Sequence, residues 1–249
     1  GEIANNVFNV APTENVYSLW PELIELSLKI INFSADLSKI DNSNIHIVES
    51  RLNLFKLVFG HIYRYLEDIN KLDQLSGYIN AMEEFIKYKD LTISTLAIAI
   101  VSEMSFYCNK KQLKHFKNLI FSIMKVTLDC LNSLSENELK VCLKSMIQMF
   151  SDDTAFLFKP HFDDLFILMG KISECKKFMD EKIRDIGFEV IISLVEHKSS
   201  YLKENQFKVL IESLFKYALE LDQDISDEWL TPKQDSYFDQ EMIEEPELS

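Results

Sequence analysis

Residues that could carry out acid–base or metal chemistry are scattered along this chain. The five histidines never pair at the spacing of metal ligands, and neither an HExxH nor a GxSxG motif occurs. Gly170-Lys171-Ile172-Ser173 ends like a phosphate-binding loop, but Leu165 stands where that loop requires its first glycine. The sequence therefore predicts no catalytic residue, no metal site and no cofactor. An enzyme would need residues that only the three-dimensional fold brings together.

One acidic run begins like a calcium site and then departs from it. Asp222-x-Asp224-x-Ser226 matches the start of an EF-hand loop. Asp227 occupies the place of the required glycine, however, and Lys233 stands where a bidentate glutamate is needed. We therefore do not expect this run to bind a metal.

The same run belongs to an acidic end of the chain. The protein carries 26 Lys+Arg against 40 Asp+Glu, a formal net charge of −14. Residues 220–249 contain 11 acidic side chains and one lysine, so this segment alone carries −10. Aromatic residues among carboxylates can bind basic peptides through ion pairs and cation–π contacts, although a solvated loop is the simpler interpretation of a charge run. The predicted binding residues are Asp222, Asp224, Asp227, Glu228 and Trp229.

The composition bears on which partners the protein binds and on the cellular compartment in which it resides. An acidic chain does not suit phosphate backbones, so we expect no direct nucleic-acid binding. No stretch approaches the roughly 18 apolar residues of a membrane span, and no secretory signal is present at the N-terminus. The four cysteines are widely spaced, which favours buried thiols in a reducing compartment.

The elements that would position any site are helices. Apolar residues recur at helical spacing, while glycine and proline together number only ten, too few for a turn-rich all-β fold. Asp90 is placed to cap the run that follows it, and Pro21 and Pro160 stand in first-turn positions. The predicted helices span residues 17–32, 46–67, 71–88, 91–107, 111–131, 136–151, 159–174, 180–198 and 203–220.

Four alternate helices share one apolar template, which indicates a repeat. The intervals between successive copies are 41, 46 and 44 residues, within the range of about 40–47 that HEAT and armadillo repeats show. This regularity favours a two-helix solenoid over a bundle with one core. The four stripes are Leu52/Phe55/Phe59/Tyr63, Ile93/Leu96/Ile100/Met104, Leu139/Cys142/Met146/Phe150 and Ile183/Ile186/Val190/Leu194.

The last copy follows the second-helix pattern of HEAT repeats most closely. We expect Asp180 to cap this helix, Gly187 to admit a close neighbour, and Arg184 to bond to an acid of the adjacent repeat. Most phenylalanines should be core, but three on first helices are candidates to line grooves between repeats: Phe116, Phe121 and Phe166. The next stripe would begin near Asp227, where the acidic run interrupts it.

Two segments resemble a known family. Trp20-Pro21-Glu22-Leu23 at the start of an amphipathic helix looks like the WPEL segment near the N-terminal part of the importin-β (karyopherin) superfamily. Asp222-x-Asp224-x-x-Asp227-Glu228-Trp229 is similar to the acidic, tryptophan-containing segment that interrupts the solenoid of the importin beta-3 type. The resemblance covers about residues 17–245 and rests on the order of features. In this chain, residues 230–233 break the acidic run, which is continuous in the family.

The resemblance implies part of a nuclear transport receptor that shuttles between cytoplasm and nucleus. Its partners would be basic cargo proteins, Phe-Gly nucleoporins and Ran-GTP. Ran would be bound through the parent protein, because the first repeats of the family precede the WPEL helix. The alternative is a HEAT-repeat scaffold of another kind, such as a phosphatase regulatory subunit or a chromatin-associated scaffold, and a helical enzyme is the third reading.

The expected architecture is therefore all-α, a right-handed α-solenoid of antiparallel helix pairs with about four and a half HEAT repeats. Residues 1–16 would form an N-terminal extension, residues 17–220 the solenoid, and residues 221–249 an acidic insertion or linker. The chain begins Gly-Glu instead of Met, which suggests a piece of a longer protein, and we expect this piece to be a monomer.

Overall fold

A computed structural model describes residues 43–222 apart from 69 and 152, together with the single residues 29, 37 and 40. The chain divides into two compact units, Gly1–Tyr201 and Leu202–Ser249, and each is described by itself. Throughout the described residues the regular structure is helical. The predicted domain limits at residues 17 and 221 stay predictions.

The helices of the first unit agree with the predicted ones. Six of the predicted helices match an observed helix of this unit to within a few residues, and the predicted helix 111–131 is divided into α7, η3 and α8. The predicted helix 17–32 lies outside the described residues except for Lys29. The α-helices of this unit are α4 (Ile45–Asp68), α5 (Leu75–Ile86), α6 (Leu91–Tyr107), α7 (Lys110–Leu113), α8 (Lys117–Ser133), α9 (Glu136–Met149), α10 (Phe162–Ser173) and α11 (Lys182–His197). Short 3-10 helices join them: η2 (Leu72–Gln74), η3 (Lys114–Phe116), η4 (Ala155–Leu157), η5 (Lys159–His161) and η6 (Ser199–Tyr201).

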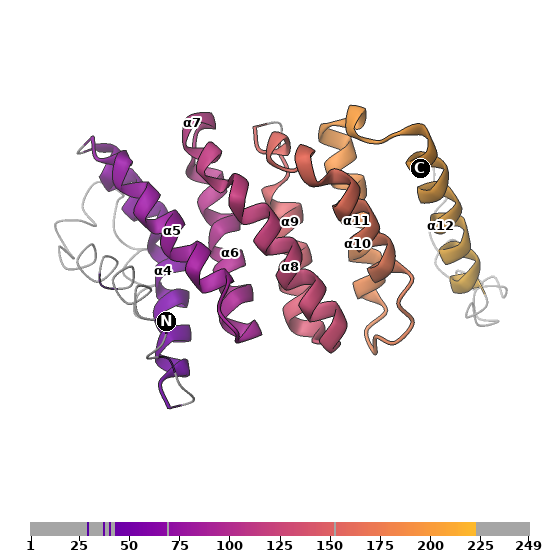
Figure 1. Ribbon diagram of the computed structural model, residues 1–249, viewed down its shortest axis with the longest axis horizontal. Coiled ribbons are helices and arrows are strands. Elements are labelled where there is room, and N and C mark those ends of the chain that lie inside the picture. The colour runs from indigo at the N-terminus through magenta and orange to yellow at the C-terminus, as the bar shows by residue number, and fades with distance from the viewer. Residues whose placement is uncertain are drawn as a thin grey trace, which may run out of the picture. The chain divides into compact units, whose positions relative to one another are not determined.

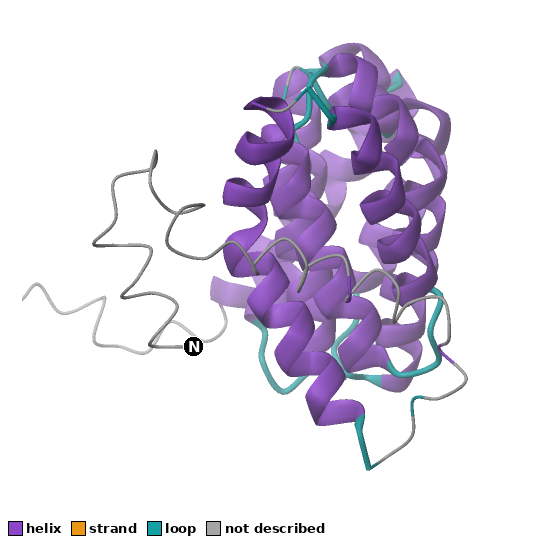
Figure 2. Ribbon diagram, turned by 90° about the vertical axis from the view of Figure 1, so that its left-hand side faces the viewer, coloured by secondary structure: helices purple, strands orange, loops and turns teal. Residues whose placement is uncertain are grey.

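These helices form antiparallel pairs that stack in two layers (Figure 1). The pairs are α5/α6, α8/α9 and α10/α11. The second helices pack on one another in the order α4, α6, α9, α11, and the first helices follow the order α5, α8, α10. We call these the B layer and the A layer, and Figure 2 shows the two layers from the end of the stack. This arrangement confirms an all-α repeat solenoid, while its right-handed sense stays a prediction.

The four predicted stripes lie on the B-layer helices and form most of the continuous core. Fourteen of their sixteen side chains are buried, and the fully enclosed ones include Leu52, Ile93, Leu139 and Ile183 at the head of each stripe. Leu96 and Ile186 are only half-buried. A stripe that is buried in every copy is what stacking of identical units requires.

Helix α6 is buried on nearly all sides because α4, α5 and α9 surround it. Its buried polar side chains are hydroxyls with hydrogen-bond partners. Ser94 and Thr95 donate to carbonyls one turn back, and Ser102 donates to the Gln148 side chain of α9 at 3.1 Å. Burial of these hydroxyls is tolerated because each hydrogen bond replaces the one lost with water.

Local signals fix the helix ends. The Asp90 carboxylate accepts from the Ile93 backbone N–H at 3.1 Å and so caps α6, as predicted. Pro160 lies in the first turn of η5, also as predicted. Helix α8 ends at Ser133. The next residue, Leu134, has a left-handed φ of 53°, and the backbone N–H of Ser135 donates back to the Cys130 carbonyl.

The second unit contains helix α12 (Glu204–Asp222), which confirms the predicted helix 203–220. Four of its apolar side chains are more than half exposed: Phe207, Val209, Phe215 and Leu219.

Candidate protein-binding surfaces

Successive helix pairs are joined by polar contacts at the loop that precedes α11. Lys140 of α9 forms an ion pair with Asp180, Nζ to Oδ2 at 2.5 Å. The Glu136 carboxylate, at the start of α9, accepts from the Met179 backbone N–H at 2.6 Å and from that of Asp180 at 3.3 Å. This loop is therefore fixed to the preceding pair through backbone as well as side-chain atoms.

Asp180 was predicted to cap α11 but lies one residue before the N-cap, Glu181, and contacts only the first residue of the helix. Its Oδ1 accepts from the Lys182 backbone N–H at 3.0 Å. The hydrogen bond from Lys140, followed by the one from the Lys182 backbone, holds the pKa of the Asp180 carboxyl below its ordinary value. The carboxylate is consequently charged at neutral pH and serves two elements at once.

Gly187 of α11 packs closely against α10. A Cβ added at this glycine would lie 2.8 Å from Ser173 Oγ and 3.2 Å from Ile172 Cγ2. Both distances are too short for ordinary van der Waals contact. The predicted role of Gly187 as a close-packing position is confirmed.

Arg184 makes a structural contact within its own pair. Its Nε donates to the Ser173 carbonyl at 2.7 Å, and the side chain is buried against α10. Ser173 ends α10, where helix carbonyls lack intrahelical partners, so a buried guanidinium satisfies one of them. The predicted bond of Arg184 to an acid of the adjacent repeat stays a prediction, while Asp180 and Lys140 form an ion pair between adjacent pairs.

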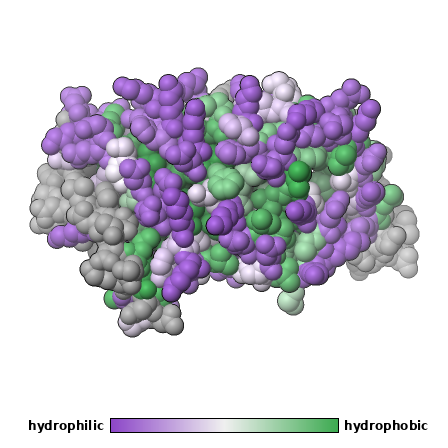
Figure 3. All heavy atoms as spheres, in the orientation of Figure 1, coloured by the Kyte–Doolittle hydropathy of each residue, from purple (hydrophilic) through white to green (hydrophobic). Residues whose placement is uncertain are grey.

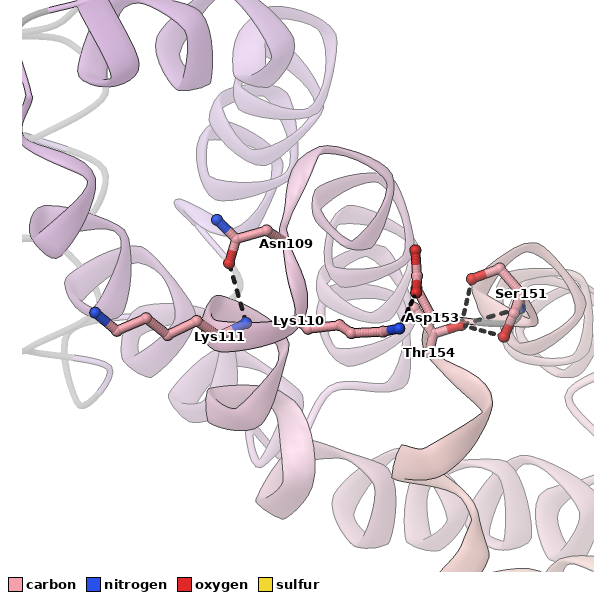
Figure 4. Close-up of polar contacts among 6 residues, drawn as sticks. All are labelled: Asn109, Lys110, Lys111, Ser151, Asp153 and Thr154. Atoms are coloured by element: carbon pink, nitrogen blue, oxygen red, sulfur yellow. Dashed lines mark hydrogen bonds and ion pairs between the residues drawn. The ribbon is translucent and has the colours of Figure 1, made fainter.

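A second polar link joins neighbouring pairs near α7 (Figure 4). Lys110 and Asp153 point toward each other and form an ion pair at 2.8 Å between exposed side chains. Asn109 caps α7 by accepting from the backbone N–H groups of Lys111 and Gln112, and Figure 4 shows Lys111 extending away from Asp153. The Lys110 ion pair and the Asn109 cap thus fix the position of α7, whereas the Lys111 side chain takes no part in the link to Asp153.

A cavity of about 480 Å³ lies between the start of α5 and this turn. Its lining combines apolar residues with polar and basic ones: Leu72, Asp73, Leu75, Ser76, Ile79, Asn109, Lys111, Gln112 and His115. The prediction of site residues missed it, because nothing in residues 72–79 or 109–115 taken alone indicates that they meet. The run of lysines from 110 to 117 is the one signal that would have drawn attention to it.

The A layer carries exposed apolar side chains. Phe121 is 62% exposed and Ile167 is 57% exposed, on the adjacent helices α8 and α10. The Phe121 ring lies 6.3 Å from the His161 ring, at the junction of these helices. Figure 3 shows hydrophobic surface between charged side chains on this face. Of the predicted groove residues, Phe121 is exposed and Phe166 is half-buried.

Phe116, the third predicted groove residue, is fully buried. It ends η3, where the chain turns into α8, and its ring fills the core instead of a surface groove. That part of the prediction is wrong, because η3 lies against α5 as well as α8 and Phe116 is enclosed among these elements.

The predicted acidic binding site is mostly outside the described residues. The backbone of Asp222 ends α12, whereas Asp224, Asp227, Glu228 and Trp229 lie beyond what the structure describes. Their proposed binding of a basic peptide stays a prediction.

The thiols are buried except one. Cys108, Cys130 and Cys142 are buried, and burial raises the pKa of the Cys108 thiol to about 12. A hydrogen bond with Cys130, together with burial, raises the pKa of Cys142. Cys175 is only half-buried, which departs from the expectation of four enclosed thiols.

The described residues contain neither a metal-binding cluster nor a membrane-spanning helix. Among them, no three His, Cys, Asp or Glu side chains lie close enough together to hold a metal ion. No helix in this part of the chain combines the length and hydropathy that a membrane span requires.

Comparison with known proteins gives one distant likeness. No family model matches the chain, and no solved structure matches it. The chain is 25% identical over 170 residues to the cullin-associated NEDD8-dissociated protein 1 of Schizosaccharomyces pombe, which covers 67% of this chain and 13% of that protein. The chain thus spans about an eighth of the length of this relative. Together with the stacked helix pairs, the likeness supports a HEAT-repeat solenoid.

Proposed function

We propose that this HEAT-repeat chain is a protein-binding segment of a nuclear transport receptor. Exposed apolar side chains on adjacent first helices, Phe121 and Ile167, are the observation that carries the proposal. An aromatic ring between two stacked helices suits the insertion of a phenylalanine from a Phe-Gly peptide, since aromatic pairs attract beyond the apolar area that they bury.

The charge distribution supports the choice of cargo. The protein has a formal net charge of −14, and a large share of it lies in the acidic end. Basic cargo proteins would be attracted by this field and would bind in a salt-dependent manner. Ran-GTP binding is proposed for the parent protein, and a receptor of this kind would shuttle between cytoplasm and nucleus.

Binding of Phe-Gly peptides tests the proposal. We expect a synthetic Phe-Gly repeat peptide to bind weakly, and the double substitution of Phe121→Ser with Ile167→Ser to weaken binding roughly tenfold, the loss typical of an interface anchor. Phe106→Ser is the matched control, because Phe106 is 65% exposed on α6 of the B layer. Equal affinity of the double variant and the wild type would contradict the proposed surface.

The intact parent supplies the second test. It should bind Ran loaded with GTP much more tightly than Ran loaded with GDP. Equal binding of the two nucleotide states would rule out the transport function and leave the HEAT scaffold in place.

A cullin-binding scaffold is the second candidate, favoured by the likeness to a protein named for its association with cullins. A chain of this type would retain a purified cullin in a binding assay and would fail both tests above. A phosphatase or chromatin scaffold would fail them too, and would instead purify with its own stable subunit.

A further inference from the structure

The turn that leads into α8 concentrates positive charge in an acidic protein. Four lysines and a histidine fall within eight residues of the first unit, and all five side chains are exposed. We call this group the basic turn: Lys110, Lys111, Lys114, His115 and Lys117. Lysines held this close repel one another, so an anion bound here would relieve that repulsion.

The carboxylates around the basic turn neutralise only part of its charge. Lys110 is paired with Asp153. No ion pair joins the other three lysines to a residue in the part of the chain that the structure describes. Asp73 lines the adjoining cavity and is the one carboxylate among its described lining residues. The basic turn is therefore a local excess of positive charge.

Contacts with neighbouring elements order the backbone of the basic turn. Oε1 of Gln112 accepts from the Asn109 backbone N–H at 2.9 Å and from the Tyr63 hydroxyl of α4 at 3.3 Å. Leu113 and Phe116 are buried between the exposed lysines. A partner would thus meet lysines on a backbone that is already ordered, which lowers the entropy lost on binding.

The cavity of about 480 Å³ between α5 and the basic turn adds an apolar component. Lys111 and His115 line it together with Leu72, Leu75 and Ile79. Leu72 is half-buried, whereas Leu75 and Ile79 are almost fully buried. The volume falls in the range of ordinary ligand sites and is ample for one large side chain. An apolar side chain that entered this cavity would therefore contact aliphatic groups next to a lysine.

We propose that the basic turn and this cavity bind a short acidic segment of another protein, with a large aliphatic side chain such as leucine inside the cavity. Acids of the segment would pair with Lys111, Lys114 and Lys117. Asp73, on the α5 side, would repel a carboxylate from the cavity itself and so favour the apolar anchor there. The site does not depend on the proposed transport function, because its ligand is neither a basic cargo nor a Phe-Gly peptide.

An acidic protein segment suits this site better than a nucleic acid does. The formal net charge of −14 opposes a long phosphate backbone that extends past the turn. None of the described lining residues is Phe, Tyr or Trp, the side chains on which bases stack. An aliphatic anchor, by contrast, matches the three aliphatic side chains of the lining.

Fluorescence anisotropy of a labelled peptide, titrated with the full chain, tests the charged part of the site. The probe is a peptide of about ten residues, aspartates and glutamates around one central leucine, and its binding should weaken as salt rises. We expect Lys111→Glu combined with Lys114→Glu to lower the affinity roughly tenfold. Lys125→Glu with Lys171→Glu is the matched control, because these exposed lysines lie on α8 and α10 outside the turn.

The control variant changes the net charge as much as the first one does, and we expect it to lower the affinity roughly twofold at most. Circular dichroism of both variants shows that the helical fold is kept. Equal losses in the two variants would reduce the effect to net charge, and unchanged affinity in the first would remove the lysines from the site. Either result would overturn the proposal.

Replacing the central leucine of the peptide tests the cavity. We expect the alanine peptide to bind the wild type several-fold more weakly, because it buries less apolar area. Ser76→Phe places a ring at a position that lines the cavity, so this variant should bind both peptides alike. Equal affinity of the two peptides for the wild type, or an advantage of leucine that survives Ser76→Phe, would overturn the proposal.

Two further measurements address other occupants. A single-stranded RNA of the same charge that binds more tightly than the peptide, and loses affinity with Lys111→Glu, would overturn the proposal in favour of a nucleic acid. A dimer in sedimentation of the wild type that Lys111→Glu dissociates would assign the turn to a second copy. Phe121→Ser with Ile167→Ser should leave acidic-peptide binding unchanged, so that failure of the Phe-Gly surface and failure of this site are told apart.

Discussion

Gly187 shows how one missing Cβ sets the distance between two helices. The position faces Ser173 and Ile172 across the α10/α11 contact, at distances that leave no room for a methyl group. We predict that Gly187→Ala lowers the free energy of unfolding by about 1–3 kcal/mol, the usual cost of overpacking a core. Urea denaturation followed by circular dichroism measures the change.

Gly170 supplies the control in the preceding helix. Nothing lies within 4 Å of a Cβ added there. Gly170→Ala should therefore raise the free energy of unfolding by about 0.5–1 kcal/mol, because alanine loses less backbone entropy in a helix. If both glycine variants change stability in the same direction, the close-approach argument for Gly187 fails.

The burial of the cysteines predicts how many thiols react in the native protein. Three are buried and Cys175 is half-buried. A thiol must be accessible and ionised to react, and burial suppresses both for Cys108, whose pKa is raised to about 12. We expect Ellman's reagent at pH 8 to modify one thiol in the native protein and four in urea. Cys175→Ser should abolish the native reaction, and rapid reaction of a second thiol would contradict the burial.

Residue roles could be predicted where they depend on neighbours in the sequence. Asp90 caps the helix that follows it, and such a cap is local. Phe116 was assigned wrongly, and the contact of Arg184 with the end of α10 was not predicted, because packing between helices chooses the partner of a long side chain. No spacing in the sequence records that the Arg184 side chain reaches the end of α10.

At the scale of the element, the spacing of apolar residues predicted nearly all of the helices in the described part of the chain. A stripe at helical spacing fixes the helix and its buried face together, so the four B-layer stripes could be located. The predicted helix 111–131 is instead α7, η3 and α8 in succession. A 3-10 turn shifts the side-chain phase by only a fraction of a turn, and the apolar pattern continues through it.

The link between α9 and the start of α11 predicts a pH dependence. The pKa of Asp180 is lowered in the folded state by Lys140. Its contribution to stability is therefore fully present above the unfolded aspartate pKa of about 3.9, and is lost as pH falls through the lower folded value. Asp180→Asn keeps an acceptor for the Lys182 backbone N–H but removes the charge.

Urea denaturation at two pH values checks this. We expect Asp180→Asn to be less stable than the wild type at pH 7, and the difference to shrink at pH 3. Lys110 and Asp153 offer a comparison: this pair joins side chains exposed to 73% and 66%, so Asp153→Asn should change stability little at either pH. A difference for Asp180→Asn that is equal at both pH values would contradict the charge argument.

For the whole molecule, the charge is unevenly distributed along the sequence. Residues 220–249 carry −10, while composition alone reports only the net charge of the whole chain, −14. The sequence could locate the acidic region because its residues are consecutive. It could not predict the cavity, whose lining residues come from two separate segments, 72–79 and 109–115.

The acidic end makes a prediction for a basic peptide. Neutralising Asp222, Asp224, Asp227 and Glu228 as amides should weaken binding of a lysine-rich peptide and flatten its salt dependence, since fewer ion pairs form. Titration at two salt concentrations measures the affinity and its salt dependence. If the variant binds as the wild type does, the acids are a solvated loop.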